Sequence, residues 1–80
     1  MAQDMTVRGT VTDETGTPLI GANILVQGTS NGTISDTDGK YELRAAKGAA
    51  LDISYTGYIT QTVLVGDNAQ IDVSMRSNEE

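Results

Sequence analysis

The stretch that decides the fold runs from Ser30 to Tyr58 and reads SNGTISDTDGKYELRAAKGAALDISYTGY. Two turn signals, Asn31-Gly32 and Asp36-Thr37-Asp38-Gly39, precede two runs, residues 40–45 and 51–55, in which apolar and polar residues alternate. Alternation with a period of two puts one face of a strand on a core and the other face in water. The stretch therefore predicts short β-strands joined by tight turns.

The same alternation continues on both sides of this stretch. Residues 7–12 and 71–75 alternate small or apolar residues with polar ones, and a weaker strand is expected at residues 33–35. No segment carries the i, i+3, i+4 apolar stripe of a helix. With two longer segments described below, the chain has seven expected strands. Their regular spacing predicts an all-β sandwich in one domain.

Two longer segments, residues 19–26 and 58–65, are also expected to be strands. In residues 19–26, one face carries Ile20, Ala22, Ile24 and Val26, and the other carries Leu19 and Leu25, which predicts a strand that is central or covered on both sides. In residues 58–65, one face carries Ile59, Val63 and Val65, with Gln61 as a polar exception.

The turn residues predict specific backbone shapes. Asn31-Gly32 is typical of a type I′ hairpin turn, because both residues tolerate positive φ. Asp36-Thr37-Asp38-Gly39 predicts a β-turn in which aspartate side chains cap nearby N–H groups and Gly39 takes positive φ. Gly57 predicts a bend between two strands.

Composition excludes several classes of function. Eleven acids against five bases give a net charge of -6, which argues against nucleic acid and anionic membranes as partners and favours a monomer. The chain has no histidine and no cysteine, so the commonest general base and all thiolate metal sites are absent. We therefore expect no catalytic residue, no cofactor and no metal, and no insertion of this chain into a membrane.

Three groups of residues remain as candidate sites. Asp36 and Asp38 have the spacing that opens a calcium loop, but the strand pattern resumes at Lys40 where further oxygen ligands would be needed, which favours a turn. Asn31-Gly32-Thr33 matches a glycosylation sequon, which the hairpin turn already explains. Tyr58, beside Gly57 and Tyr55, is the candidate for contact with a partner or a glycan.

Several motifs together resemble one known family. These are Val7-x-Gly9-x-Val11, Gly16-x-Pro18-Leu19-x-Gly21-Ala22-Asn23, Val26-x-Gly28-Thr29, Gly32-Thr33-x-x-Asp36-x-Asp38-Gly39-x-Tyr41-x-Leu43, and Leu51-x-Ile53-Ser54-Tyr55-x-Gly57-Tyr58. Over residues 6–75 the chain resembles the carboxypeptidase-regulatory-like (transthyretin-like) domain at the N-terminus of SusC-like TonB-dependent outer-membrane transporters of Bacteroidetes. The resemblance implies a seven-stranded Greek-key sandwich at residues 6–76, between an N-terminal tail, 1–5, and a C-terminal tail, 77–80. It supplies no catalytic or binding residues.

The resemblance also implies a place and a role. The domain is expected on the periplasmic side of the outer membrane, after a cleaved signal peptide and before a TonB box, a plug and a barrel that imports glycans or peptides. It is expected to be a non-catalytic accessory domain that acts by protein-protein contact or by spacing. Its expected partners are that plug and barrel, and TonB or another periplasmic protein. Two alternatives stay open: a carbohydrate-binding sandwich, and a structural accessory of a surface or secreted protein such as a hydrolase.

Overall fold

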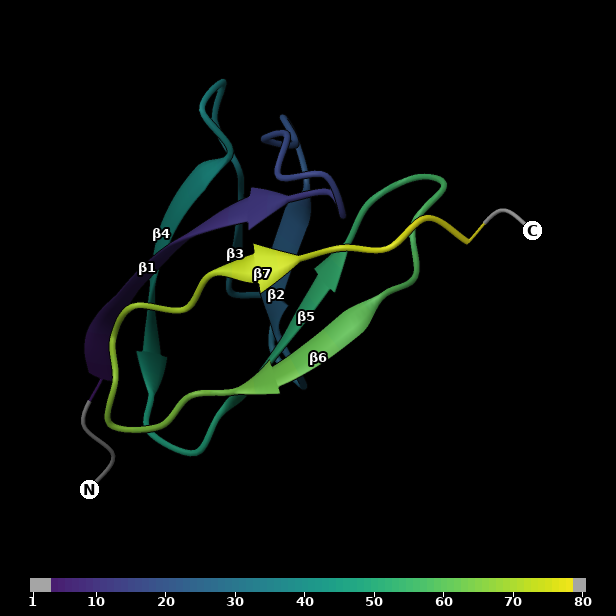
Figure 1. The fold of residues 1–80 in the computed structure, drawn as a ribbon. Coiled ribbons are helices and arrows are strands. Elements are labelled where there is room, and N and C mark those ends of the chain that lie inside the picture. The colour runs from purple at the N-terminus through teal and green to yellow at the C-terminus, as the bar shows by residue number, and fades with distance from the viewer. Residues whose placement is uncertain (1–3, 79–80) are drawn as a thin grey trace.

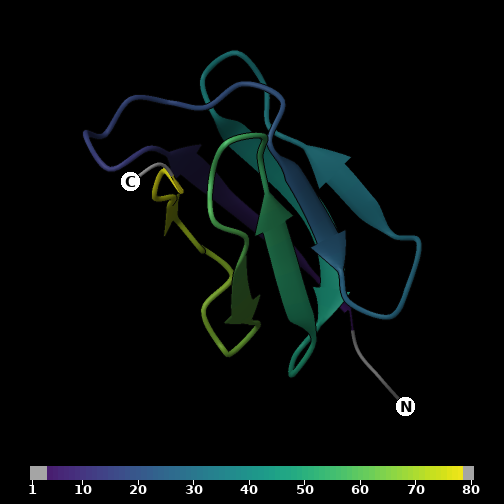
Figure 2. The same cartoon turned by 90° about the vertical axis from the view of Figure 1, so that its right-hand side faces the viewer.

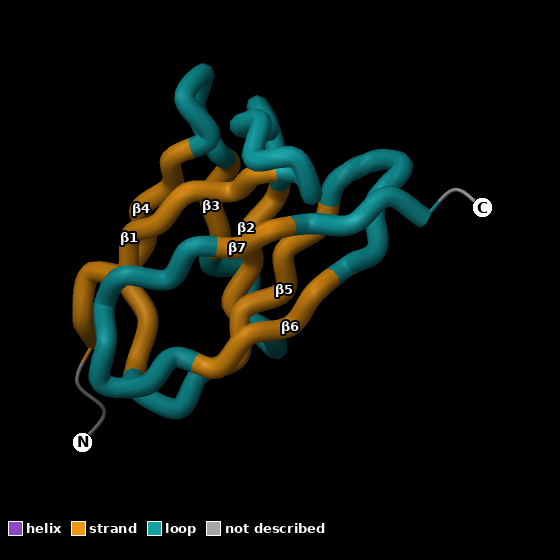
Figure 3. Tube along the Cα trace, in the orientation of Figure 1, coloured by secondary structure: helices purple, strands orange, loops and turns teal. Residues whose placement is uncertain are grey.

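The structure is a computed structural model that describes residues 4–78. It contains seven strands: β1 (Asp4–Thr12), β2 (Asn23–Val26), β3 (Gly32–Ile34), β4 (Lys40–Ala46), β5 (Ala50–Ser54), β6 (Gln61–Leu64) and β7 (Val73–Ser74). Figure 1 shows their order along the chain, and Figure 3 shows that turns and loops make up the rest of the described part. The all-β class and the seven strands expected from alternation are confirmed.

The strands form two sheets that pack face to face. One sheet has the order β4-β1-β7, and the other has the order β3-β2-β5-β6. All neighbours are antiparallel except β1 and β7, which run parallel. Hairpins join β2 to β3 and β5 to β6, whereas the other connections cross between the sheets, which gives the Greek-key sandwich (Figure 2).

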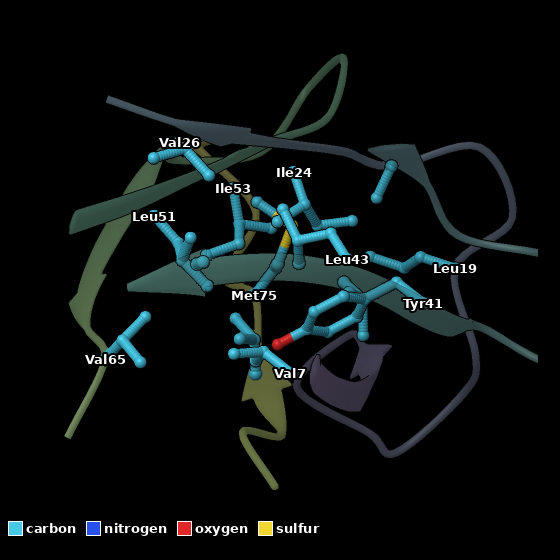
Figure 4. Packing of buried hydrophobic residues seen from close by; sticks show 14 residues of the cluster. Val7, Leu19, Ile24, Val26, Tyr41, Leu43, Leu51, Ile53, Val65 and Met75 are labelled. Carbon is cyan, nitrogen blue, oxygen red and sulfur yellow. The ribbon is translucent and has the colours of Figure 1, made fainter. Parts of the chain in front are cut away.

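The core lies between the two sheets and takes alternate residues from both. Val7 and Val11 of β1 and Leu43 of β4 meet Ile24 of β2 and Ile53 of β5. Figure 4 shows Met75, from the segment after β7, among these side chains. Met75 is completely buried. These inward positions match the alternation read from the sequence.

Gly9 lets the segment before β7 lie directly on β1. A Cβ atom at Gly9 would stand 1.7 Å from the carbonyl oxygen of Ile71, a distance that no side chain tolerates. The same oxygen accepts a hydrogen bond of 2.6 Å from the hydroxyl of Tyr41 on β4. The carbonyl of Ile71 thus packs on β1 and is hydrogen-bonded to β4, which holds the segment before β7 against both strands.

The segment 19–26 is only partly a strand. β2 begins at Asn23, and it lies between β3 and β5, so the expected central position is confirmed. The expected faces are wrong at the start of the segment, because Leu19 is buried while Ile20 is 56% exposed. Gly21 has a φ of 82°, and the turn that it makes interrupts the alternation before β2.

The expected type I′ turn at Asn31-Gly32 is also wrong. Among residues 4–78 no residue other than glycine has positive φ, and Gly32 lies inside β3, opposite Leu25. The chain turns earlier, where the amide of Thr29 donates to the carbonyl of Val26 and Gly28 has a φ of 82°. Ser30 and Asn31 then lead into β3.

The expected strand at residues 58–65 is shorter than its pattern, whereas β1 begins earlier than expected. β6 covers residues 61–64, and Ile59 is 51% exposed rather than inward, because it precedes the strand. Gln61 does face the inner side, where its side-chain amide donates to the carbonyl of Ser74. β1 begins at Asp4, which pairs with Ala46, two residues before the expected boundary.

Candidate interaction surface

Tyr58 sits in the turn that follows β5. Its amide donates to the carbonyl of Tyr55 over 3.0 Å, and Gly57 supplies a φ of 86°, so the predicted bend at Gly57 is confirmed. The two tyrosine rings lie 5.6 Å apart between centroids and are tilted by 56°. Both rings are half-buried and pack against the core. A partner or glycan contact at Tyr58 stays a prediction.

The same turn holds the segment in which the described chain ends. The amide of Ile59 donates to the carbonyl of Arg76, and the amide of Asn78 donates to the carbonyl of Gly57, while Tyr58 and Ser77 form an antiparallel bridge. The sequence does not predict this role of the tyrosine turn. Ser77 and Asn78 belong to the expected C-terminal tail, 77–80, and residues 79–80 of that tail lie outside the described residues. No apolar alternation marks the segment, so only backbone pairing reveals it.

The aspartate turn between β3 and β4 has the predicted shape. One carboxylate oxygen of Asp36 accepts hydrogen bonds from the amides of Asp38 and Lys40, each 2.9 Å long. Gly39 donates to the carbonyl of Asp36 and has a φ of 77°. In residues 4–78 no three acidic side chains gather as a metal site would require. Cation binding at Asp36 and Asp38 has no support in this geometry.

A similar turn follows β1 and concerns Asp13. Its carboxylate accepts hydrogen bonds from the amide and hydroxyl of Thr15 and from the amide of Thr17. The Thr15 hydroxyl is the main cause that lowers the pKa of this carboxyl below its ordinary value. The carboxylate of Asp13 is therefore already used in hydrogen bonds within its own loop.

The two outer faces of the sandwich differ in character. Strand alternation puts polar side chains on the outer face of β1 and β4, apart from Ala46 at the end of β4. Among them, Arg8 and Glu42 form an ion pair of 3.6 Å. The outer face of β3-β2-β5-β6 carries exposed aliphatic side chains, namely Leu25 (40% exposed), Ile34 (61%) and Leu64 (71%). Asn23, Ser54 and Thr62 are polar outward residues on the same face. Leu25 and Ile34 lie on either side of Gly32, and adjoining apolar groups that remain in water are typical of a contact surface.

Asp52 lies in the middle of this aliphatic face and is satisfied locally. Its carboxylate accepts a hydrogen bond of 2.8 Å from the hydroxyl of Thr62 on β6 and one of 3.2 Å from the side chain of Gln27. Among the outward positions of the four strands, Asp52 is the charged residue. The face thus pairs aliphatic groups with one carboxylate that already has partners.

The β3 edge borders two hollows. A hollow of about 600 Å³ opens above Gly32, between Leu25 and Ile34, and a second of about 570 Å³ lies between β3 and the outer face of β1 and β4. At one end of this second region, the side-chain amide of Asn31 donates to the carbonyl of Arg44 over 2.8 Å. The nitrogen that a glycan would occupy in the sequon is therefore engaged in holding β3 near β4.

Comparisons with known proteins agree on one family. The model of the CarboxypepD_reg-like domain matches residues 7–80. The chain is 44% identical over 79 residues to the TonB-dependent receptor SusC of Bacteroides thetaiotaomicron, and 41% identical over 80 residues to the TonB-dependent receptor P3 of Formosa agariphila. These matches cover 99% and 98% of the chain, but only 8% of each relative.

Solved structures share the fold at low identity. A chain in a type II cohesin–X–dockerin complex from Acetivibrio cellulolyticus superposes with a TM-score of 0.76 at 20% identity, covering 91% of this chain and 58% of that one. The 3-chlorocatechol 1,2-dioxygenase of Rhodococcus opacus superposes with a TM-score of 0.68 at 12% identity, covering 96% and 60%. These likenesses establish the sandwich fold alone.

Residues 4–78 hold no helix with the length and hydropathy that crossing a bilayer requires.

Proposed function

The chain belongs to the CarboxypepD_reg-like domain family, and from this membership we propose that it is a non-catalytic accessory domain of a SusC-like TonB-dependent transporter. The observation that carries the proposal is 44% identity to SusC over 99% of the chain. In this role the domain precedes the plug and barrel on the periplasmic side of the outer membrane. The transporter imports glycans or peptides.

The domain acts by protein contact. Its surface supports this role, because one outer face carries polar side chains apart from Ala46, while the other keeps Leu25, Ile34 and Leu64 in water. Candidate partners are the plug and barrel of the same transporter, TonB, or another periplasmic protein. A glycan platform would need an aromatic ring presented to solvent. Tyr55 and Tyr58 instead pack on the core, and Tyr41 is buried.

The experiment is to delete the domain from the intact transporter and measure substrate uptake together with TonB engagement. The proposal expects uptake to fall while the amount of barrel in the outer membrane stays unchanged. A deletion variant that imports substrate and engages TonB at the rates of the intact transporter would refute the proposed role.

A further inference from the structure

We propose that the outer edge of β3 takes up an extended, basic segment of a partner polypeptide as an additional strand, with one large apolar side chain of that segment placed over Gly32. The biological setting of this inference rests on the proposed role in protein contact. The surface itself is a property of the isolated chain and is tested there.

The first support is the direction of the backbone groups in β3. The amide of Val26 donates to the carbonyl of Asn31, and the amide of Ser35 donates to the carbonyl of Ala22, so Asn31 and Ser35 face β2. In an antiparallel ladder the bonding direction alternates along the strand. Gly32 and Ile34 therefore point their N–H and C=O groups outward, and β3 is an edge of its sheet. These four groups are those that an added strand uses.

The second support is the gap above Gly32. Gly32 lies in β3 without positive φ and carries no side chain. A Cβ there would stand 2.8 Å from the carbonyl oxygen of Ile24 and 3.2 Å from Cδ1 of Leu25, so the room lies further out, beyond the Leu25 side chain. With Ile34 on its other side, this gap forms the hollow of about 600 Å³. A large side chain directly across from an edge glycine fills such a gap by cross-strand contact. Leu25 and Ile34 then lose their contact with water.

The third support concerns the kind of occupant. β3 has three residues, which at about 3.3 Å per residue span only about 10 Å, so two copies joined along this edge would bury far less than the roughly 800 Å² per partner of a stable interface. Each copy also carries a charge of -6 and repels another copy. A basic segment of a different polypeptide avoids the repulsion, and a transient contact with it does not need the area of a stable dimer.

The charge of the chain selects a basic segment. Arg8 and Glu42 neutralise one another in their ion pair. Asp36 and Asp38 in the turn after β3 are balanced by Lys40 and Arg44 of β4. The whole chain carries a charge of -6, so lysine or arginine at the ends of the segment improves the contact.

The test uses a synthetic heptapeptide that alternates threonine and valine around a central tyrosine and carries a lysine at each end. The isotope-labelled chain is titrated with this peptide, and amide chemical shifts are followed by NMR. We expect shifts confined to Leu25 and residues 31–35, and slowed exchange of the Gly32 and Ile34 amides. Ile34→Lys, which puts a charge on the edge, should weaken binding at least about tenfold. Leu64→Lys, at the opposite edge of the same sheet, should change it less than about twofold.

Several results would overturn the proposal. These are no shifts, shifts centred on β6, equal affinity in the Ile34→Lys variant, equal affinity for a peptide with glutamate ends, and a dimer of the chain alone in sedimentation. Circular dichroism shows whether each variant is folded. If the Ile34→Lys chain is unfolded, a peptide with alanine at its centre is titrated into the unsubstituted chain instead. This alanine peptide should bind at least about threefold more weakly than the tyrosine peptide. Failure here leaves the transporter role standing, since uptake after deletion decides that role separately.

Discussion

Gly9 is the residue where the packing of the sandwich tolerates least change. A methyl group there would meet the backbone of Ile71, which cannot move without breaking its hydrogen bond to Tyr41. We expect Gly9→Ala to lower the free energy of unfolding by more than about 3 kcal/mol. The matched control is Gly66→Ala, because a Cβ at Gly66 meets nothing within 4 Å. Urea denaturation of both variants compares them, and equal stability would contradict the packing described.

Tyr41 gives the fold a dependence on alkaline pH. Burial raises the pKa of Tyr41 to about 12 from an ordinary 10.0, and the Asp72 carboxylate adds to the rise. As pH increases, the unfolded chain loses this proton first, so the stabilisation is complete below pH 10 and is lost between pH 10 and about 12.

Thermal melts of Tyr41→Phe between pH 9 and 12 provide the check. The variant should be less stable at neutral pH by about 1 kcal/mol, because the bond to Ile71 is lost. Its stability should also fall less steeply than that of the parent chain above pH 10. Parallel curves for the two proteins would show that Tyr41 does not cause the alkaline loss.

At the scale of single elements, β3 should show an alternating pattern of amide exchange. Thr33 pairs with Ile24 and its backbone faces β2, whereas the amides of Gly32 and Ile34 face outward. Hydrogen exchange followed by NMR should therefore be at least about tenfold slower at Thr33 than at Ile34. Similar protection at both amides would mean that β3 is not an edge in solution.

The turn after β5 should control the order of the segment that it pairs with. Gly57→Ala places a side chain at a φ of 86°, which costs about 1 kcal/mol, and the bond between Asn78 and the Gly57 carbonyl should loosen. The amide of Asn78 should then exchange faster. Thr56→Ala, at an exposed neighbour in the same turn, is the control. An unchanged exchange rate of the Asn78 amide in Gly57→Ala would show that the turn does not control the order of this segment.

The elements that could be predicted from sequence are those in which alternation and turn chemistry act alone. In β4 every second residue is buried, as the alternation of Tyr41, Leu43 and Ala45 with polar residues predicts. Asp36 caps its own turn, also as predicted. Prediction failed at Ile20 and Asn31, because Gly21 and Gly28 took the positive φ that sets the turns. Which of several turn residues bends the chain depends on the pairing of distant strands. A local pattern does not contain that information.

The candidate surface was harder to predict for the same reason. Leu25 lies on the second apolar face of residues 19–26 and is expected to be covered, and Ile34 lies in the weakest expected strand. The sequence therefore does not single out either residue as part of an exposed surface. They become neighbours across Gly32 only when β3 lies beside β2. Tyr58 was chosen for its residue type, and its backbone pairing with Ser77 depends on a segment 19 residues further along the chain.

At the scale of the whole molecule, the sandwich presents a polar face and an aliphatic face on opposite sides of one core. The chain spans about 8% of the length of the two relatives named above, and in the proposed role this asymmetry acts within a much larger protein. A domain that served only as a spacer would need no such difference between its faces. The asymmetry therefore favours contact over spacing.

The most direct measurement replaces the domain in its transporter with a flexible glycine-serine linker of the same end-to-end reach and follows the initial rate of substrate uptake. The linker keeps the spacing and removes both faces. Our account predicts that uptake falls at least about tenfold, the change that about 1.4 kcal/mol of coupling produces, with unchanged barrel in the outer membrane. Uptake at the full rate through the linker variant would contradict a role in contact.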